Sequence, residues 1–141
     1  MNDTTLLIID TQVGLIEPAY RGKEVLDNIN ILLAQARASH TPVIYVQHDG
    51  PKGHGLEVAT PAWSISPAIA PQEGDLIVHK RAFDAFYDTM LKQKLEAQRI
   101  QHDEAVLTAA QRIAYLNEVV NGFASDTHSI TVKPTNEVTF S

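Results

Sequence analysis

Cysteine is absent from this chain of 141 residues, so the chain can form neither a disulfide bond nor a thiolate metal site. Long apolar runs are absent too, and none approaches the roughly 20 residues that a helix needs to cross a bilayer. Basic residues are outnumbered, because 11 Lys and Arg face 17 Asp and Glu, for a net charge of −6. This balance argues against a nucleic-acid surface. We therefore expect no membrane and no nucleic acid among its partners.

The N-terminus has no basic segment before its first apolar run, and that run ends in Asp10. This pattern predicts a first strand instead of a signal peptide, so the cytoplasm is the expected compartment. Internal repeats and low-complexity segments are also lacking. The length and the apolar fraction of 44% suit one domain over residues 1–141, large enough to bury a core.

Strand and helix patterns alternate along the first two thirds of the chain. The runs "TLLIID" (5–10), "PVIYVQHDG" (42–50) and "DLIVHK" (75–80) are typical of strands, and the first suits a strand buried on both faces of a parallel sheet. Helices are predicted over 24–39 and 82–100, joined to the strands by loops over 11–22 and 50–74. This order predicts an α/β fold, a three-layer α/β/α sandwich with a mostly parallel sheet. The predicted core face of the first helix consists of Val25, Ile29, Leu32, Leu33 and Ala36.

Glycine and proline are missing between Gly74 and Gly122, and the stretch Lys94–Tyr115 is typical of an uninterrupted helix. A helical pattern also covers 107–120, and a last strand is predicted over 129–140. Either one long helix forms, or two helices meet near residues 101–102. A fused helix would be about 55 Å long, more than the diameter of so small a domain. We therefore expect a homo-oligomer, most simply a dimer with possible swapping of segments.

Five stretches carry a resemblance to a known family: "LLIIDTQVGL", "PVIYVQHDG", "TPAWSISPAIAPQEGDLIVHKRAFDAFYDTML", "LTAAQRIAYLNEVV" and "ITVKPTNEV". In this order they resemble the isochorismatase-like cysteine hydrolases over nearly the whole chain. The resemblance implies a doubly wound, Rossmann-like α/β domain that cleaves C–N or vinyl-ether bonds in small molecules. It implies no cofactor.

The resemblance assigns catalytic roles to Asp10 and Lys80, which follow the first and third predicted strands. Open α/β sheets place ligand crevices at such carboxyl ends. A nearby ammonium lowers the pKa of a thiol, and a carboxylate can take its proton, which is the logic of a cysteine nucleophile. The alternatives without a catalytic role are that Asp10 caps a loop and that Lys80 is a solvated residue at a strand end.

The nucleophilic cysteine of the family has no counterpart here. Family members have a strand–helix–strand unit of about 30 residues between the second helix and "LTAAQ". That central unit is missing, so the domain carries an apparent internal deletion near 100–106. A serine substitute at Ser64 or Ser66 lacks the G-x-S-x-G turn that would support it.

Further candidates for binding a small-molecule ligand are Gln12, His48, Trp63, Phe86 and Tyr87. The aromatic residues, with Phe83, could line an apolar pocket or could equally be core or subunit contacts. His48 lies where nicotinamidase-type relatives bind a metal, but a metal needs several convergent ligands. We expect no metal site, and a hydrogen-bonded histidine at a strand end instead.

Three hypotheses follow for the function. The chain descends from isochorismatase-like hydrolases and retains their reaction, or it is an inactive relative that keeps a small-molecule site around Asp10 and Lys80. As a third possibility, it is an assembly module whose shortened fold needs a second chain.

Overall fold

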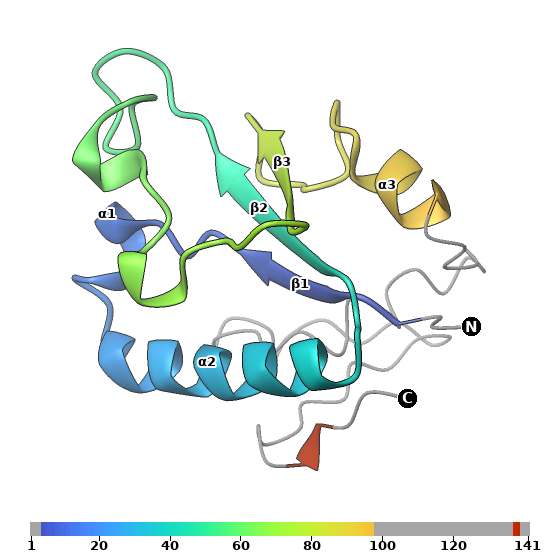
Figure 1. Ribbon diagram of the computed structural model, residues 1–141. Helices are drawn as coiled ribbons and strands as arrows, with labels where there is room; N and C mark the ends of the chain where they lie inside the picture. The colour runs from blue at the N-terminus through green and yellow to red at the C-terminus, as the bar shows by residue number, and fades with distance from the viewer. Residues whose placement is uncertain (1–3, 98–136, 139–141) are drawn as a thin grey trace, which may run out of the picture.

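Three parallel strands form the centre of the computed structural model, which describes residues 4–97 and 137–138. The strands β1 (Leu6–Ile9), β2 (Val43–His48) and β3 (Leu76–Lys80) lie in the order β1-β2-β3 (Figure 1). All the pairings are parallel, with Leu6 opposite Val43 and His48 opposite Lys80. The predicted parallel α/β fold is therefore confirmed. The helices are α1 (Val13–Ile16), α2 (Gly22–Ala38) and α3 (Leu91–Ala97), with short 3-10 helices η1 (Pro61–Trp63) and η2 (Pro67–Ile69).

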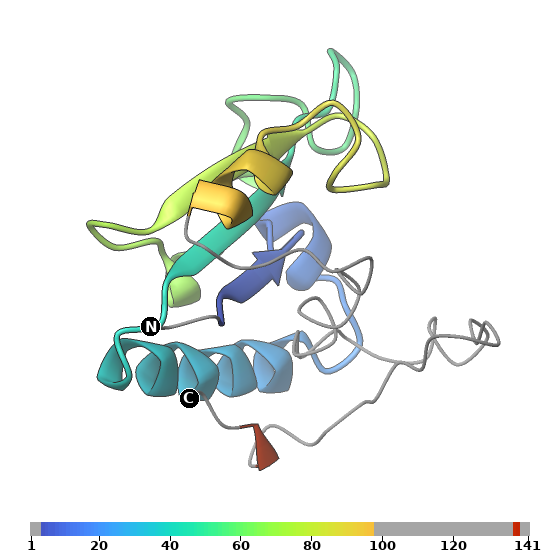
Figure 2. The same cartoon turned by 90° about the vertical axis from the view of Figure 1, so that its right-hand side faces the viewer.

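Helices cover both faces of the sheet, because alternate side chains of a strand point to opposite sides. Figure 2 shows α2 and α3 on opposite sides of the strands. On the α2 side, Leu6, Ile8 and Tyr45 join a buried cluster with the helix. The cluster on the α3 side contains Leu7, Ile44, Val46, Val78, Leu91 and Leu95. This arrangement explains why β1 and β2 are continuous apolar runs.

The predicted core face of α2 is confirmed. Four of its residues are buried and Val25 is partly buried against the same cluster; the buried ones are Ile29, Leu32, Leu33 and Ala36. The helix begins at Gly22, two residues earlier than expected. A Cβ at Gly22 would lie 2.1 Å from the carbonyl oxygen of Ile16. The close approach of the two segments therefore requires glycine at this position.

The prediction of a helix over 82–100 was wrong about where the helix begins, because α3 begins only at Leu91. Side chains in the preceding segment form hydrogen bonds with nearby backbone groups, which compete with the helical pattern. Asp84 accepts from the amide of Phe86, and the hydroxyl of Thr89 donates to the carbonyl of Ala85. Thr89 Oγ1 also accepts from the amide of Leu91, in the manner of a helix cap. Phe86 and its neighbours thus lie in a turn segment before the helix.

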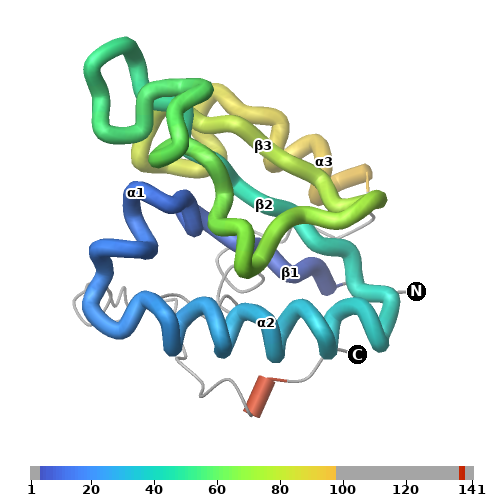
Figure 3. The backbone as a smooth tube through the Cα atoms, turned by 60° about the vertical axis from the view of Figure 1, so that its left-hand side comes forward, coloured from blue at the N-terminus to red at the C-terminus, as the bar shows by residue number. Residues whose placement is uncertain are grey.

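The loop expected over 11–22 contains the single-turn helix α1, which is labelled in Figure 3. The long loop over 50–74 contains η1 and η2. Several predictions lie outside the described residues. These are the fused helix beyond Ala97, the helix over 107–120, most of the strand over 129–140 and the deletion near 100–106. In the part of the chain that the structure describes, no helix is long and apolar enough to cross a membrane.

An ion pair joins the end of α2 to the start of β3. The guanidinium of Arg37 donates to both carboxylate oxygens of Asp75, at 3.2 and 3.0 Å. The hydrogen bond to Asp75 raises the pKa of Arg37. Close by, the fully buried Tyr45 donates its hydroxyl to the carbonyl of Ile69 at 2.8 Å. Burial, with a smaller effect of Asp75, raises the pKa of Tyr45 to about 12.

The raised pKa of Tyr45 predicts a loss of stability at alkaline pH. Between pH 10 and about 12, Tyr45 would be ionised in the unfolded chain but still protonated in the folded one. The free energy of unfolding should therefore fall as pH rises through this window, by up to about 3 kcal/mol from this group. Urea unfolding at several pH values measures the fall. Tyr45→Phe should show a shallower slope, and an equal slope in both proteins would contradict the prediction.

Candidate functional site

Asp10 and Lys80 form an ion pair at the carboxyl ends of β1 and β3. Lys80 Nζ lies 2.8 Å from Asp10 Oδ2, with side-chain exposures of 4% and 29%. The long lysine side chain spans the intervening strand β2, and the amide of Asp10 donates to the carbonyl of Val46 on that strand. The expected proximity of the two residues is confirmed. Their catalytic roles stay predictions.

The ion pair leaves one polar atom without a partner. Lys80 Nζ also donates to the carbonyl of Phe83 at 3.0 Å, so two of its three N–H groups are used. Asp10 Oδ1 is buried and has no hydrogen-bond partner among the described residues. A buried acceptor without a partner costs about 1–3 kcal/mol or more when it is charged. The site therefore favours a bound group that offers a hydrogen-bond donor.

Backbone strain accompanies this arrangement. Asp10 has φ = 57°, in the left-handed region that residues other than glycine rarely adopt. The turn brings the chain from the end of β1 directly to Gln12. Residues in such conformations persist only where surrounding contacts hold them.

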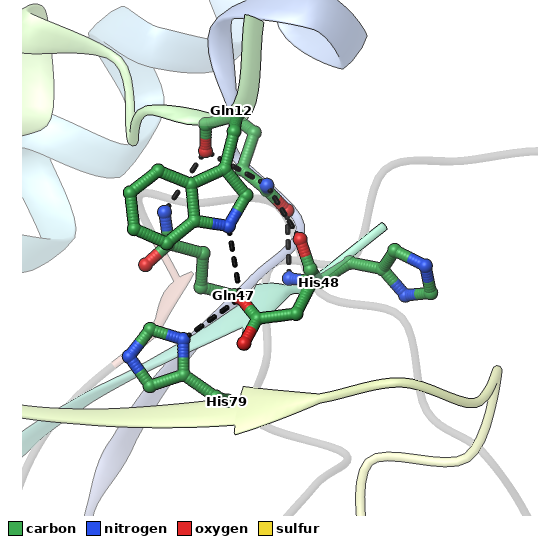
Figure 4. Close-up of polar contacts among 6 residues, drawn as sticks. Gln12, Gln47, His48 and His79 are labelled. Carbon is green, nitrogen blue, oxygen red and sulfur yellow. Dashed lines mark hydrogen bonds and ion pairs between the residues drawn. The ribbon is translucent and has the colours of Figure 1, made fainter. Parts of the chain in front are cut away.

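Gln12 provides those contacts. Its side chain is fully buried, and its Nε2 donates to the carbonyls of His48 and Trp63 at 2.9 and 2.8 Å. Its Oε1 accepts from the amide of His48 at 2.8 Å. Gln47 Nε2 donates to the same carbonyl of Trp63 at 2.9 Å (Figure 4). The Gln12 amide thus pairs with both backbone groups of His48, as a neighbouring strand would, and holds the loop that contains η1 on the end of the sheet.

A second polar cluster lies beside this network. Asp49 Oδ1 accepts from the indole Nε1 of Trp63 at 2.8 Å, and His79 Nδ1 lies 2.9 Å from the same oxygen. The rings of Trp63 and His79 are stacked, with centroids 6.0 Å apart and an interplanar angle of 14°. Sequence reasoning missed this pair. No signal in the sequence indicated it, because the contact joins side chains 30 residues apart that meet only through the register of the sheet.

The predicted ligand-binding residues have different environments. The hydrogen-bonding groups of Gln12 are occupied by backbone. Trp63 is half-buried, Phe86 packs against the α3-side cluster, and Tyr87 is 68% exposed. Phe83, whose carbonyl accepts a hydrogen bond from Lys80 Nζ, has a fully exposed ring. Ligand binding by these residues stays a prediction.

His48 lies near a second histidine, His54, with ring centroids 5.6 Å apart. His54 Nδ1 accepts from the amide of Leu56, so the neutral ring carries its proton on Nε2 and offers no free lone pair. Within residues 4–97 and 137–138, no group of three or more His, Asp or Glu side chains is placed to hold a metal ion. The two histidines therefore do not form a metal site by themselves.

Replacement of the buried Gln12 should destabilise the fold. Gln12→Leu keeps the volume but leaves the amide and carbonyl of His48 without their partner, so the free energy of unfolding should fall by about 2–4 kcal/mol. Urea unfolding measures the change. Gln93→Leu, at an exposed glutamine of α3, is the matched control and should stay within about 0.5 kcal/mol of the parent. Equal effects of the two substitutions would contradict the bridging role of Gln12.

Comparison of the sequence with known proteins identifies the family of this chain. The isochorismatase domain family matches residues 4–108. Streptothricin hydrolase of Streptomyces noursei is 34% identical over 95 residues, which cover 65% of this chain and 34% of that protein. The secreted isochorismatase effector Isc1 of Verticillium dahliae is 33% identical over 98 residues, 67% of this chain and 52% of that protein. This chain thus aligns with about a third to a half of the length of these relatives.

Solved structures agree. A crystal structure of an isochorismatase family protein superposes with a TM-score of 0.64 and 34% identity, covering 72% of this chain and 61% of that chain. An isochorismatase from Pseudomonas putida KT2440 gives a TM-score of 0.60 and 32% identity, covering 71% and 52%. The resemblance seen in the motifs is therefore confirmed by sequence, by domain family and by fold. This chain belongs to the isochorismatase domain family.

Proposed function

We propose that this chain binds a small molecule at the Asp10–Lys80 pair and does not cleave it by the thiol mechanism of the family. The observation that carries the proposal is an ion pair between the buried Lys80 and the partly buried Asp10, in a chain without cysteine. Asp10 Oδ1 has no partner among the described residues. The pair is suited to assist a thiol, because an ammonium favours the thiolate and a carboxylate can accept the thiol proton. The chain has no thiol, so the proposed role of the Asp10 carboxylate and the Lys80 ammonium is to bind the ligand.

The remaining hydrogen-bonding capacity of the pair suggests the class of ligand. Lys80 has one N–H beyond its two described contacts, and Asp10 Oδ1 is a buried acceptor without a partner among the described residues. A group with adjacent C=O and N–H functions, such as a primary amide, would satisfy both. Amides are also cleaved through their C–N bond by the hydrolases that the family resemblance implies. The proposed ligand is therefore a small amide.

Loss of the Asp10 charge should weaken this binding. Asp10→Asn should weaken the binding of benzamide, followed by NMR titration, by about tenfold or more, because a charged hydrogen bond is worth about 1.5–3 kcal/mol. Hydrolysis of benzamide and of isochorismate should stay at the uncatalysed rate in the parent chain, since loss of a nucleophile costs several orders of magnitude. Release of benzoate or pyruvate measures turnover.

Asp27→Asn is the matched control, because Asp27 is an exposed carboxylate on α2 paired only with the exposed Lys23 among the described contacts. It should leave benzamide binding unchanged. If the parent chain hydrolyses either substrate and Asp10→Asn abolishes the reaction, the chain is an active hydrolase without a thiol. If benzamide binds neither protein, the ligand class is wrong.

A homodimer is the proposed assembly. The segment of residues 81–90 exposes three large apolar side chains, those of Phe83, Tyr87 and Met90, at 102%, 68% and 56%. Exposed apolar side chains gathered in this way often mark contact surfaces. A second copy of the chain would bury them, in line with the oligomer expected from the sequence. The cytoplasmic location stays a prediction; one relative, Isc1, is described as secreted.

Charged substitution in this segment should disrupt the dimer. Phe83→Asp places a charge where the proposed contact needs an apolar ring, so sedimentation velocity at micromolar concentration should show a monomer in place of a dimer. Tyr20→Asp is the control, because Tyr20 is 86% exposed on another part of the surface. A monomeric parent chain would overturn the proposed assembly.

A further inference from the structure

The contact between Asp49 and His79 determines which nitrogen of the imidazole is available. Asp49 Oδ1 already accepts from Trp63 Nε1, and an ionised carboxylate can only accept. His79 Nδ1, 2.9 Å from that oxygen, therefore carries the proton. The lone pair of neutral His79 is left on Nε2, and Figure 4 shows this nitrogen directed away from the contact. A histidine oriented in this way by a carboxylate presents a basic, nucleophilic nitrogen.

The ring of His79 is also held in place. It stacks on Trp63, whose indole N–H is bound by Asp49 and whose carbonyl is bound by Gln12 and Gln47. The Asp49 side chain is only 16% exposed, whereas His79 is 47% exposed. The orienting carboxylate is thus shielded from water while the imidazole remains accessible. Fixed orientation of a reacting group lowers the entropic cost of attack.

The pair is distinct from the Asp10–Lys80 site. His79 and Lys80 are consecutive in β3, so their side chains point to opposite faces of the sheet. Lys80 is buried in its ion pair, and His79 is half-exposed. A reaction at His79 would therefore depend neither on Asp10 nor on the proposed amide ligand.

We propose that His79 is a nucleophile toward activated aryl esters of short acids. Nε2 attacks the ester carbonyl, the N–C bond forms, the C–O bond to the aryl group breaks, and aryloxide leaves. Asp49 stabilises the positive charge that develops on the ring. Water then attacks the acyl-imidazole, the C–N bond breaks, and the acid is released while the proton passes to solvent. The net reaction consumes one ester and one water and yields one acid and one phenol.

Hydrolysis of p-nitrophenyl acetate by the full chain tests the proposal. His79→Gln should lower the rate of p-nitrophenolate release about tenfold, because one oriented imidazole carries most of the reaction. Asp49→Asn should lower it severalfold, since an amide stabilises the charged ring less well than a carboxylate. Intact-mass analysis after acid quench should show an acetyl group on the parent chain, mapped to His79, and none at that residue in His79→Gln.

His40→Asn is the matched control. His40 is exposed and has φ = 55°, a conformation that asparagine tolerates well. Its substitution should leave the rate unchanged. Circular dichroism of His79→Gln should match the parent, because the side chain is half-exposed. Equal losses in His40→Asn and His79→Gln, or an acetyl group found on other histidines and not on His79, would overturn the proposal.

Discussion

The buried side chain of Gln12 is the contact on which the functional end of this molecule depends. Its side-chain amide forms hydrogen bonds with the backbone amide and carbonyl of His48, where β1 no longer pairs with β2. It also donates to the carbonyl of Trp63. Without it, the amide and carbonyl of His48 would lose this partner, and the carbonyl of Trp63 would keep only its hydrogen bond from Gln47. The strained turn at Asp10 and the position of Trp63 both follow from this one bridge. Gln12 therefore acts on the site through the backbone that it positions.

The Asp10–Lys80 pair has a structural role that does not depend on a nucleophile. A buried ammonium is costly unless a carboxylate and further acceptors surround it, and Asp10 with the carbonyl of Phe83 supplies them. Removal of either charge would leave the other uncompensated. The two residues thus stabilise each other in the fold whether or not a thiol is present.

The pleat of β3 places the side chains of His79 and Lys80 on opposite faces at one end of the sheet. Lys80 points to the face where its charge is buried, and His79 points to the face where the loop holding Trp63 leaves it half-exposed. Parallel register brings His79 beside Gln47 and Lys80 beside His48. A shift of this register by one residue would exchange the two faces and destroy both arrangements. The register is held because Val78, Ile44 and Val46 must remain in the core.

Much of the described fold could be predicted from the sequence, because apolar periodicity is a local signal. The apolar run before Asp10 predicted β1, and the apolar face from Ile29 to Ala36 predicted the buried side of α2. The motifs around Lys80 identified the family and predicted the ion pair with Asp10.

The late start of α3 could not be predicted. Asp84 and Thr89 form hydrogen bonds with backbone groups, and a helical pattern alone does not reveal these bonds. Nor could the role of Gln12 or the contact of Asp49 with His79, 30 residues away, be predicted. The sequence determined the apolar core of the strands and of α2 through the spacing of apolar side chains, and the parallel sheet through the alternation of strand and helix patterns. Only the tertiary structure decided which polar groups meet, because hydrogen bonds between distant segments depend on register and on the path of the loops.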